Sequence, residues 1–240
     1  MNDSPKEKPC GFGSKDLALP EELRGPLRAH LKNLREAYVK RDWAGRVGFG
    51  KRPAVLVIDL AAYWLDPAKQ IGSNLDSVVN ATAQVLKAAR AAQAPILFTS
   101  YAYDPAHPAS PHDLKLKMGL PPQPDAFFRL DPRLEHRPTE MIIKKRYASA
   151  FKSTNLHEIL TGLGIDTLIV TGVSTSHCVY ATCRDATDSF RVIVPREAVG
   201  ERCELMHEVF LLDIDIDLAD VTPLADVVRY LENAVKGVSA

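Results

Sequence analysis

The chain has 240 residues, of which 46% are hydrophobic and 25% charged, a composition typical of a globular protein with one substantial core. Thirty basic residues balance thirty acidic ones, so there is no net charge to attract a nucleic-acid backbone or an anionic membrane. No apolar run is long enough to cross a bilayer, and the first residues contain no apolar signal core, so we expect a cytoplasmic protein.

Residues 1–47 differ in character from the rest, and we expect them to form an extension that carries an amphipathic helical arm. Apolar side chains recur there at helical spacing, with charged residues between them: Leu23, Leu27, Leu31, Leu34 and Tyr38. The sequence leaves open whether this apolar stripe packs on its own domain or on another subunit.

From residue 48 onward, short β-branched runs alternate with longer segments of helical periodicity. We expect strands at 53–60, 94–100, 140–144, 166–172 and 191–195. We expect helices at 73–92, 156–163, 176–188, 201–212 and 223–233. Near-continuous apolar strands separated by helices predict a mainly parallel sheet covered on both faces, a three-layer α/β/α domain over residues 48–240.

The four cysteines and seven histidines show no spacing typical of a metal site, and we expect no metal or other cofactor. Disulfides are rare in the cytoplasm, so each thiol is either a small buried side chain or a reactive group. We expect structural roles for Cys10, Cys183 and Cys203.

Polar residues follow three of the predicted strands, at the edge where parallel sheets bind their ligands. Asp59 ends the apolar run PAVLVIDL, Lys144 and Lys145 follow EMII, and Cys178 follows DTLIVTGVSTSH in the first turn of a helix. Taken alone, an Asp at a strand end is more often a helix cap or turn former, a Lys pair is more often solvated, and a buried Cys is usually a small core side chain. Together they suit nucleophilic attack on a carbonyl, because a helix N-terminus and a nearby lysine lower the pKa of a thiol.

The motifs VIDL, KKRYASAF and VTGVSTSHCVYAT resemble those of the isochorismatase-like cysteine hydrolase superfamily, whose members carry an Asp-Lys-Cys triad on a three-layer α/β fold. Within it, GFGKRPAVLVIDL, STSHCV, REAVGER and HEVFLLDIDIDLADV are similar to the branch that contains N-carbamoylsarcosine amidase and maleamate amidohydrolase. The motifs follow one another in order from about Gly48 to the last helix, which makes the resemblance specific.

The resemblance implies that Cys178 is the nucleophile, Asp59 the acid at the strand end and Lys145 the triad lysine. Lys144 is the rival, because a slip of one residue in the alignment would select it. The branch also implies a homodimer or homotetramer that acts on a small-molecule amide. The balanced charge gives no reason to expect a nucleic-acid or membrane partner.

The resemblance extends to the substrate pocket. It implies a cis peptide bond between Val173 and Ser174, which would turn the amides of Ser174 and Cys178 toward a substrate oxygen as an oxyanion hole. Arg202 in REAVGER stands where carbamoylsarcosine-type members hold the substrate carboxylate. His177 replaces the glycine common before the nucleophile, and we count it as a candidate substrate contact.

The implied activity is hydrolysis of the C–N bond of a small linear, carboxylate-bearing amide or carbamoyl compound, with release of ammonia through a thioester intermediate. The stretch LAAYWLDP after Asp59 lacks the DxH-type metal ligands of nicotinamidases, which argues against that activity. Two alternatives stay open: a vinyl ether hydrolase of the isochorismatase type, and a catalytically silent binding or scaffold protein.

Overall fold

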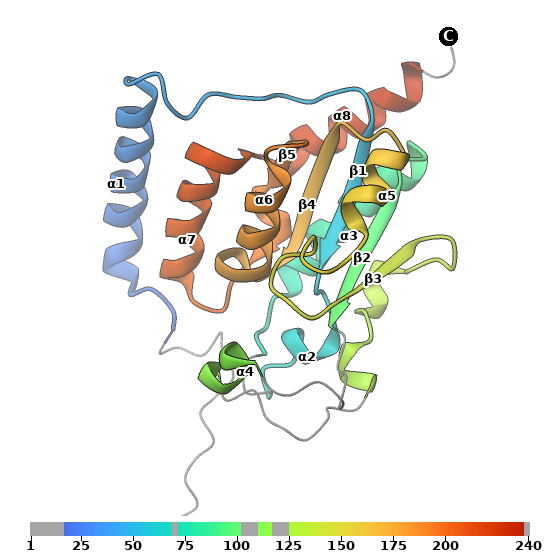
Figure 1. Cartoon of the computed structure of the whole chain (residues 1–240). Coiled ribbons are helices and arrows are strands. Elements are labelled where there is room, and N and C mark those ends of the chain that lie inside the picture. The colour runs from blue at the N-terminus through green and yellow to red at the C-terminus, as the bar shows by residue number, and fades with distance from the viewer. Residues whose placement is uncertain (1–16, 69–71, 102–109, 117–124, 238–240) are drawn as a thin grey trace, which may run out of the picture.

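The computed structural model describes residues 17–68, 72–101, 110–116 and 125–237, and its centre is a twisted sheet between layers of helices (Figure 1). Within these residues the sheet has seven strands, and the strands pair in parallel in the order β3-β2-β1-β4-β5-β7, with β6 beside the end of β4. The strands are β1 (Pro53–Ile58), β2 (Ile96–Tyr101), β3 (Met141–Lys145), β4 (Thr167–Val173), β5 (Arg191–Pro195), β6 (Val199–Gly200) and β7 (Asp220–Thr222).

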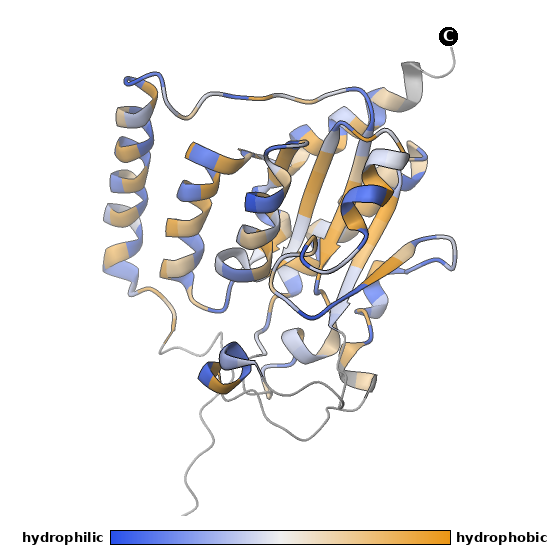
Figure 2. Cartoon of the chain, in the orientation of Figure 1, coloured by the Kyte–Doolittle hydropathy of each residue, from blue (hydrophilic) through white to orange (hydrophobic). Residues whose placement is uncertain are grey.

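Helices cover both faces of the sheet, which confirms the predicted three-layer α/β/α architecture (Figure 1). Alternate residues of β1 point into two separate cores: Leu56 packs with α5, α6 and α7, whereas Val57 packs with α3 and α8. The strands β1 and β4 are therefore buried along their whole length, and Figure 2 shows the central strands as mainly hydrophobic. The helices are α1 (Glu21–Val39), α2 (Ala62–Leu65), α3 (Asp76–Ala91), α4 (Pro111–Leu116), α5 (Leu156–Gly162), α6 (Tyr180–Ala186), α7 (Glu204–Asp213) and α8 (Leu224–Gly237).

The pairing of β1 with β4 continues to the edge of the sheet where the candidate site lies. Six consecutive residue pairs join the strands, and the last is Ile58 with Gly172. Gly172 has a φ of 107°, and a Cβ at this position would collide with the backbone of Ile58. Only glycine therefore allows the two strands to stay paired up to the segment that carries Cys178.

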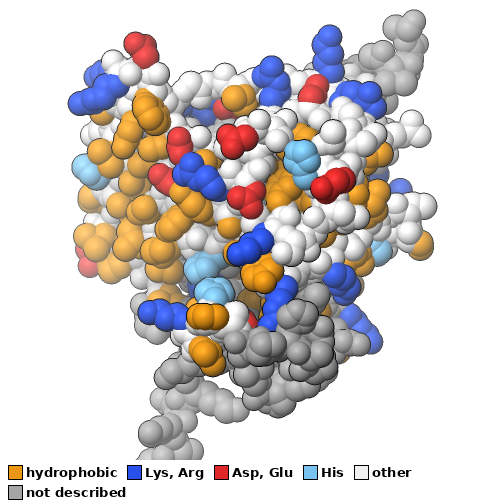
Figure 3. Space-filling model, viewed as in Figure 1, with side chains coloured by type: hydrophobic (Ala, Val, Ile, Leu, Met, Phe, Trp, Pro, Cys, Tyr) orange, Lys and Arg blue, Asp and Glu red, His pale blue; other side chains and the backbone are white. Residues whose placement is uncertain are grey.

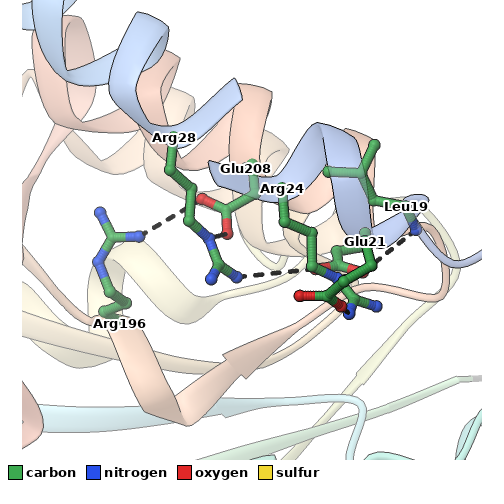
Figure 4. A network of polar contacts seen from close by, with 7 residues as sticks. Leu19, Glu21, Arg24, Arg28, Arg196 and Glu208 are labelled. Carbon is green, nitrogen blue, oxygen red and sulfur yellow. Dashed lines mark hydrogen bonds and ion pairs between the residues drawn. The ribbon is translucent and has the colours of Figure 1, made fainter. Parts of the chain in front are cut away.

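The predicted N-terminal arm forms α1, which lies alongside α7 (Figure 1). Within α1, which is described over its full length, no side chain is buried. Arginines join the two helices instead: Arg24 bonds Glu204 over 2.9 Å, and Arg28 bonds Glu208 over 2.8 Å (Figure 4). Apolar side chains of α1 and α7 gather on the surface that these helices share (Figure 3).

The structure differs from the predicted elements mainly at the edge of the sheet that carries the site. The predicted helix 176–188 begins instead as a π-helical turn, Thr175–Val179, and the predicted helix 201–212 begins only at Glu204. The strands β6 and β7 were not predicted, because two or three residues are too short to show a periodic pattern. None of the described helices is long and apolar enough to cross a membrane.

Candidate active site

The carboxyl ends of β1, β3 and β4 bring three functional groups into contact. Asp59 directly follows β1, Lys145 is the last residue of β3, and Cys178 lies in the π-helical turn that follows β4. Lys145 Nζ lies 2.6 Å from Asp59 Oδ2 and 3.4 Å from Cys178 Sγ. The ammonium therefore contacts both the carboxylate and the thiol.

The two adjacent lysines point in opposite directions, as neighbours on a strand must. Lys144 is exposed, whereas only 3% of the surface of Lys145 is accessible. Lys145 also donates a hydrogen bond to the carbonyl oxygen of Tyr147, 3.2 Å away. The structure thus brings Lys145, and not Lys144, to Asp59 and Cys178.

The carboxylate of Asp59 is held from two sides. Its Oδ1 accepts a hydrogen bond from Thr99 Oγ1 over 2.6 Å, while Oδ2 faces Lys145. The backbone of Asp59 has a φ of 50°, which costs a residue with a Cβ about 1 kcal/mol. Its N–H donates to the same Thr99 hydroxyl over 3.1 Å, so this contact helps to hold the strained turn. Thr99 was missed in the sequence, where its only signal is a polar residue inside the apolar strand ILFTSY.

The environment of Cys178 contradicts the expected lowering of its pKa. Burial raises the pKa of the thiol, the carboxylate of Asp59 raises it further, and Lys145 opposes this only in part, so that the pKa is about 12. Although burial alone would lower the pKa of Lys145, its negative partners Asp59 and Cys178 raise it. The expectation is wrong because desolvation and the nearby carboxylate outweigh the helix N-terminus and the lysine. In the free protein at neutral pH the thiol is protonated and the lysine is charged.

The peptide bond between Val173 and Ser174 is cis, as the resemblance implied. Ser174 lies at the start of the turn, and its carbonyl oxygen accepts hydrogen bonds from the backbone N–H groups of His177 and Val179. Ser174 and Cys178 both line a pocket that opens beside the triad. The two backbone amides predicted to form an oxyanion hole therefore belong to residues of one pocket wall.

This pocket has a volume of about 190 Å³, equal to roughly six water molecules at about 30 Å³ each. A volume of this size suits a small molecule. Trp64, Tyr101 and Leu116 form much of its apolar wall, and none of the three was singled out in the sequence.

The two predicted substrate contacts, His177 and Arg202, line the same pocket. Arg202 Nη1 donates to Ser174 Oγ over 3.3 Å, and its Nη2 lies 3.3 Å from Nε2 of His177. The guanidinium is therefore held against the cis peptide and the imidazole, on the wall that carries Cys178.

The sequence of this chain is similar to those of known proteins. The family model of the isochorismatase domain matches residues 53–226. The chain is 34% identical to N-carbamoylsarcosine amidase of Arthrobacter sp. over 223 residues, which cover 88% of this chain and 84% of that protein. The chain belongs to the isochorismatase family. It is also 33% identical over 201 residues to maleamate amidohydrolase of Pseudomonas putida, covering 80% of this chain and 92% of that protein.

Solved structures show the same isochorismatase-family fold. The crystal structure of a cysteine hydrolase from Pseudomonas syringae pv. phaseolicola superposes with a TM-score of 0.71 at 24% identity, covering 79% of this chain and 97% of that one. The predicted fold and the predicted place among the amidohydrolases of the family are confirmed.

The other cysteines of this family member lie away from the pocket or outside the described residues. Cys183 belongs to α6, and its side chain is buried in the core, where burial raises the pKa of the thiol to about 12. Cys203 precedes α7 and is half-buried, and Cys10 lies outside the described residues. Within the described part of the chain, no group of three or more His, Cys, Asp or Glu side chains is arranged to hold a metal ion.

Proposed function

We propose that this isochorismatase-family enzyme hydrolyses the C–N bond of a small linear amide or carbamoyl compound that bears a carboxylate, with Cys178 as the nucleophile. The observation that carries the proposal is the contact of Asp59, Lys145 and Cys178 at the wall of a pocket that also presents Arg202. Two relatives, N-carbamoylsarcosine amidase and maleamate amidohydrolase, support the same reaction class.

In the first half of the reaction, the Asp59 carboxylate takes the thiol proton while Cys178 Sγ forms a bond to the carbonyl carbon. The electron pair of the carbonyl moves to its oxygen, which accepts hydrogen bonds from the amides of Ser174 and Cys178. The protonated Asp59 then gives its proton to the leaving nitrogen. The C–N bond breaks, ammonia departs, and an acyl thioester remains on Cys178.

In the second half, a water molecule attacks the thioester carbonyl while Asp59 takes one of the protons of the water. The C–S bond breaks, and the departing sulfur regains a proton from Asp59. The acid product leaves with the oxygen of the water, and Asp59 is again a carboxylate. Over the cycle one amide and one water give one acid and one ammonia.

The raised pKa of Cys178 explains why the thiol needs a neighbouring base. A thiol with a pKa of about 12 is protonated at neutral pH, so proton removal must accompany attack on the substrate. Lys145 stays charged throughout and compensates whichever of Asp59 and Cys178 is negative.

The two alternative functions lack the support that the amidase has. Hydrolysis of a vinyl ether has no need of a nucleophilic thiol, yet Cys178 lies against a base and an ammonium. A silent scaffold would follow if His177 filled the pocket. The His177 ring is instead drawn toward Arg202, and a pocket of about 190 Å³ remains beside Cys178.

The test is ammonia release from a panel of maleamate, N-carbamoyl amino acids, ureido acids, biuret and nicotinamide. We expect hydrolysis of a carboxylate-bearing member and its loss in Cys178→Ser, which is nearly isosteric but replaces the thiol by an alcohol that is far harder to ionise. Cys183→Ser is the matched control and stays active. Equal loss in both folded variants, or hydrolysis of none of the amides by the wild type, overturns the proposal.

We also propose a homo-oligomer, a dimer or a tetramer, whose interface includes α1 and α7. Both helices expose apolar side chains on one surface (Figure 3), and the α1 side chains are bonded to the body mainly through arginines. The exposed apolar residues are Leu23, Leu34, Tyr38, Val39, Leu205, Met206 and Val209.

The need for a reduced Cys178 agrees with a cytoplasmic location, which we also propose.

A further inference from the structure

A buried carboxylate that the reaction scheme does not use lies directly behind the pocket wall. Glu201 follows β6, and only 1% of the surface of its side chain is accessible. A buried carboxylate is costly unless charged or polar partners surround it, so its partners indicate its role.

The two carboxylate oxygens of Glu201 bond two different parts of the site. Oε2 accepts hydrogen bonds from the backbone N–H of Ser176 over 3.0 Å and from Ser176 Oγ over 2.6 Å. Oε1 accepts a bond from the backbone N–H of Arg202 over 2.9 Å and lies 3.7 Å from Arg202 Nε. Ser176 belongs to the turn that carries Cys178, so one side chain links the nucleophile to the pocket arginine.

The contacts close into a ring that passes through His177. Because the Ser176 hydroxyl donates to Glu201, its oxygen is left to accept from Nδ1 of His177, 2.8 Å away. Arg202 Nη2 lies 3.3 Å from Nε2 and 3.5 Å from Nδ1 of His177, so the guanidinium packs against the imidazole. His177, where the branch commonly has glycine, thus orients the guanidinium of Arg202.

Glu201 is not placed to exchange protons during the reaction. Burial alone would raise its pKa, but the imidazole of His177, 3.9 Å away, the hydrogen bonds from Ser176 and the charge of Arg202 lower the pKa to about 2. The carboxylate is therefore ionised at every pH at which such an enzyme works.

We infer that Glu201 is a positioning residue that fixes the turn Thr175–Val179 and Arg202 relative to each other through the ring of Ser176 and His177. Attack by Cys178 and binding of the substrate carboxylate then depend on a single buried side chain. The inference rests on the proposed function insofar as Arg202 is taken to bind that carboxylate.

Glu201→Gln distinguishes a positioning role from a purely electrostatic role of Glu201. The two roles predict opposite changes in the binding of an anionic substrate. Removal of a negative charge beside Arg202 would by itself strengthen binding of an anionic substrate. Glutamine, however, has one acceptor oxygen and one N–H₂ donor group, so it cannot accept from both Ser176 and Arg202. One link of the ring is lost, and positioning predicts weaker binding and slower attack.

The kinetic test compares Glu201→Gln with the wild type on an anionic amide and a neutral amide. We expect kcat to fall about 10- to 100-fold on both substrates, and KM to rise about fivefold or more on the anionic amide alone. Glu140→Gln is the matched control: Glu140 is also a buried carboxylate that bonds an arginine, Arg90, and a backbone N–H, but it lies at the start of β3. An unchanged or lower KM for the anionic amide, or the same losses in Glu140→Gln, overturns the inference.

A second readout needs no amide hydrolysis and so separates failure of this inference from failure of the proposed function. The rates at which iodoacetate, an anion, and iodoacetamide, a neutral reagent, alkylate Cys178 are measured by mass spectrometry. A positioned Arg202 favours iodoacetate, and we expect the iodoacetate-to-iodoacetamide ratio to fall about threefold or more in Glu201→Gln. A ratio that rises shows that Glu201 acts only through its charge.

Two further variants complete the alkylation test. In an Arg202→Ala background, Glu201→Gln should leave the ratio unchanged, because its effect passes through Arg202. If Glu201→Gln does not fold, Ser176→Ala removes one link of the ring and should lower the ratio in the same way. A lowered ratio in neither folded variant overturns the inference.

Discussion

At the scale of single residues, the candidate site depends on which of two adjacent lysines faces the sheet edge. We predict that Lys145→Met lowers amide hydrolysis about 1,000-fold or more, because Asp59 keeps its charge but loses its ammonium partner. Lys144→Met should stay within about twofold of the wild type, since Lys144 is exposed. Ammonia release and circular dichroism of both variants check this, and equal losses would contradict the assignment of Lys145.

Arg202 carries the prediction about substrate charge. Arg202→Ala should raise KM for a carboxylate-bearing amide by one to two orders of magnitude, from the loss of a charge-assisted hydrogen bond worth about 1.5–3 kcal/mol. A neutral amide should be nearly unaffected. Arg196→Ala removes a nearby exposed arginine that pairs with Glu208, outside the pocket, and is the control. Equal effects of Arg202→Ala on anionic and neutral amides would show that this residue does not select the substrate.

The sequence predicts those residues of the site whose signal is local. Asp59, Lys145 and Cys178 each interrupt or follow an apolar strand within a recognisable motif, and the structure brings all three into contact. Thr99 and Glu201 could not be found in this way, because their partners lie 40 and 25 positions away in the chain. The pKa of Cys178 was predicted in the wrong direction because it depends on burial and on the distance to Asp59, which only the fold determines.

At the scale of elements, α1 carries a prediction about assembly. Leu34→Glu in α1 and Val209→Glu in α7 should each dissociate the oligomer, because both apolar side chains are exposed on helices that lie alongside each other. Leu163→Glu alters a comparably exposed leucine at the end of α5 and should leave the assembly intact. Size-exclusion chromatography with light scattering measures the mass, and a wild-type monomer at micromolar concentration would refute the proposal.

Most elements were predictable because a buried parallel sheet leaves a strong apolar pattern. The five longer strands and their helices follow from this pattern, although their ends shift by up to four residues. The π-helical turn that carries Cys178 was not predictable, since it looks like an ordinary first helical turn in the sequence. The extension of residues 1–47 and the domain of residues 48–240 remain predictions.

At the scale of the whole molecule, Glu201 links the site to stability in acid. Its pKa is about 2 in the folded protein and 4.5 in an unfolded chain, so ionised Glu201 stabilises the fold above pH 4.5. This stabilisation is lost as the pH falls from 4.5 toward 2, and amounts to about 2 kcal/mol between pH 7 and pH 3. Urea unfolding at both pH values should show a correspondingly smaller acid loss for Glu201→Gln than for the wild type. Equal losses of stability in Glu201→Gln and the wild type would mean that other carboxylates determine the stability of the protein in acid.

The high pKa of Cys178 also affects how fast this thiol reacts with oxidants. Peroxide reacts with thiolates far faster than with thiols, and the first product is a sulfenic acid. A thiol with a pKa of about 12 is almost entirely in the unreactive form while the pocket is empty. An unfolded chain lacks the burial and the carboxylate that raise this pKa, so its cysteine ionises nearer to 8.5 and oxidises more readily. Burial and the Asp59 carboxylate, which raise the pKa of Cys178, therefore also slow the oxidation of this thiol in the folded protein.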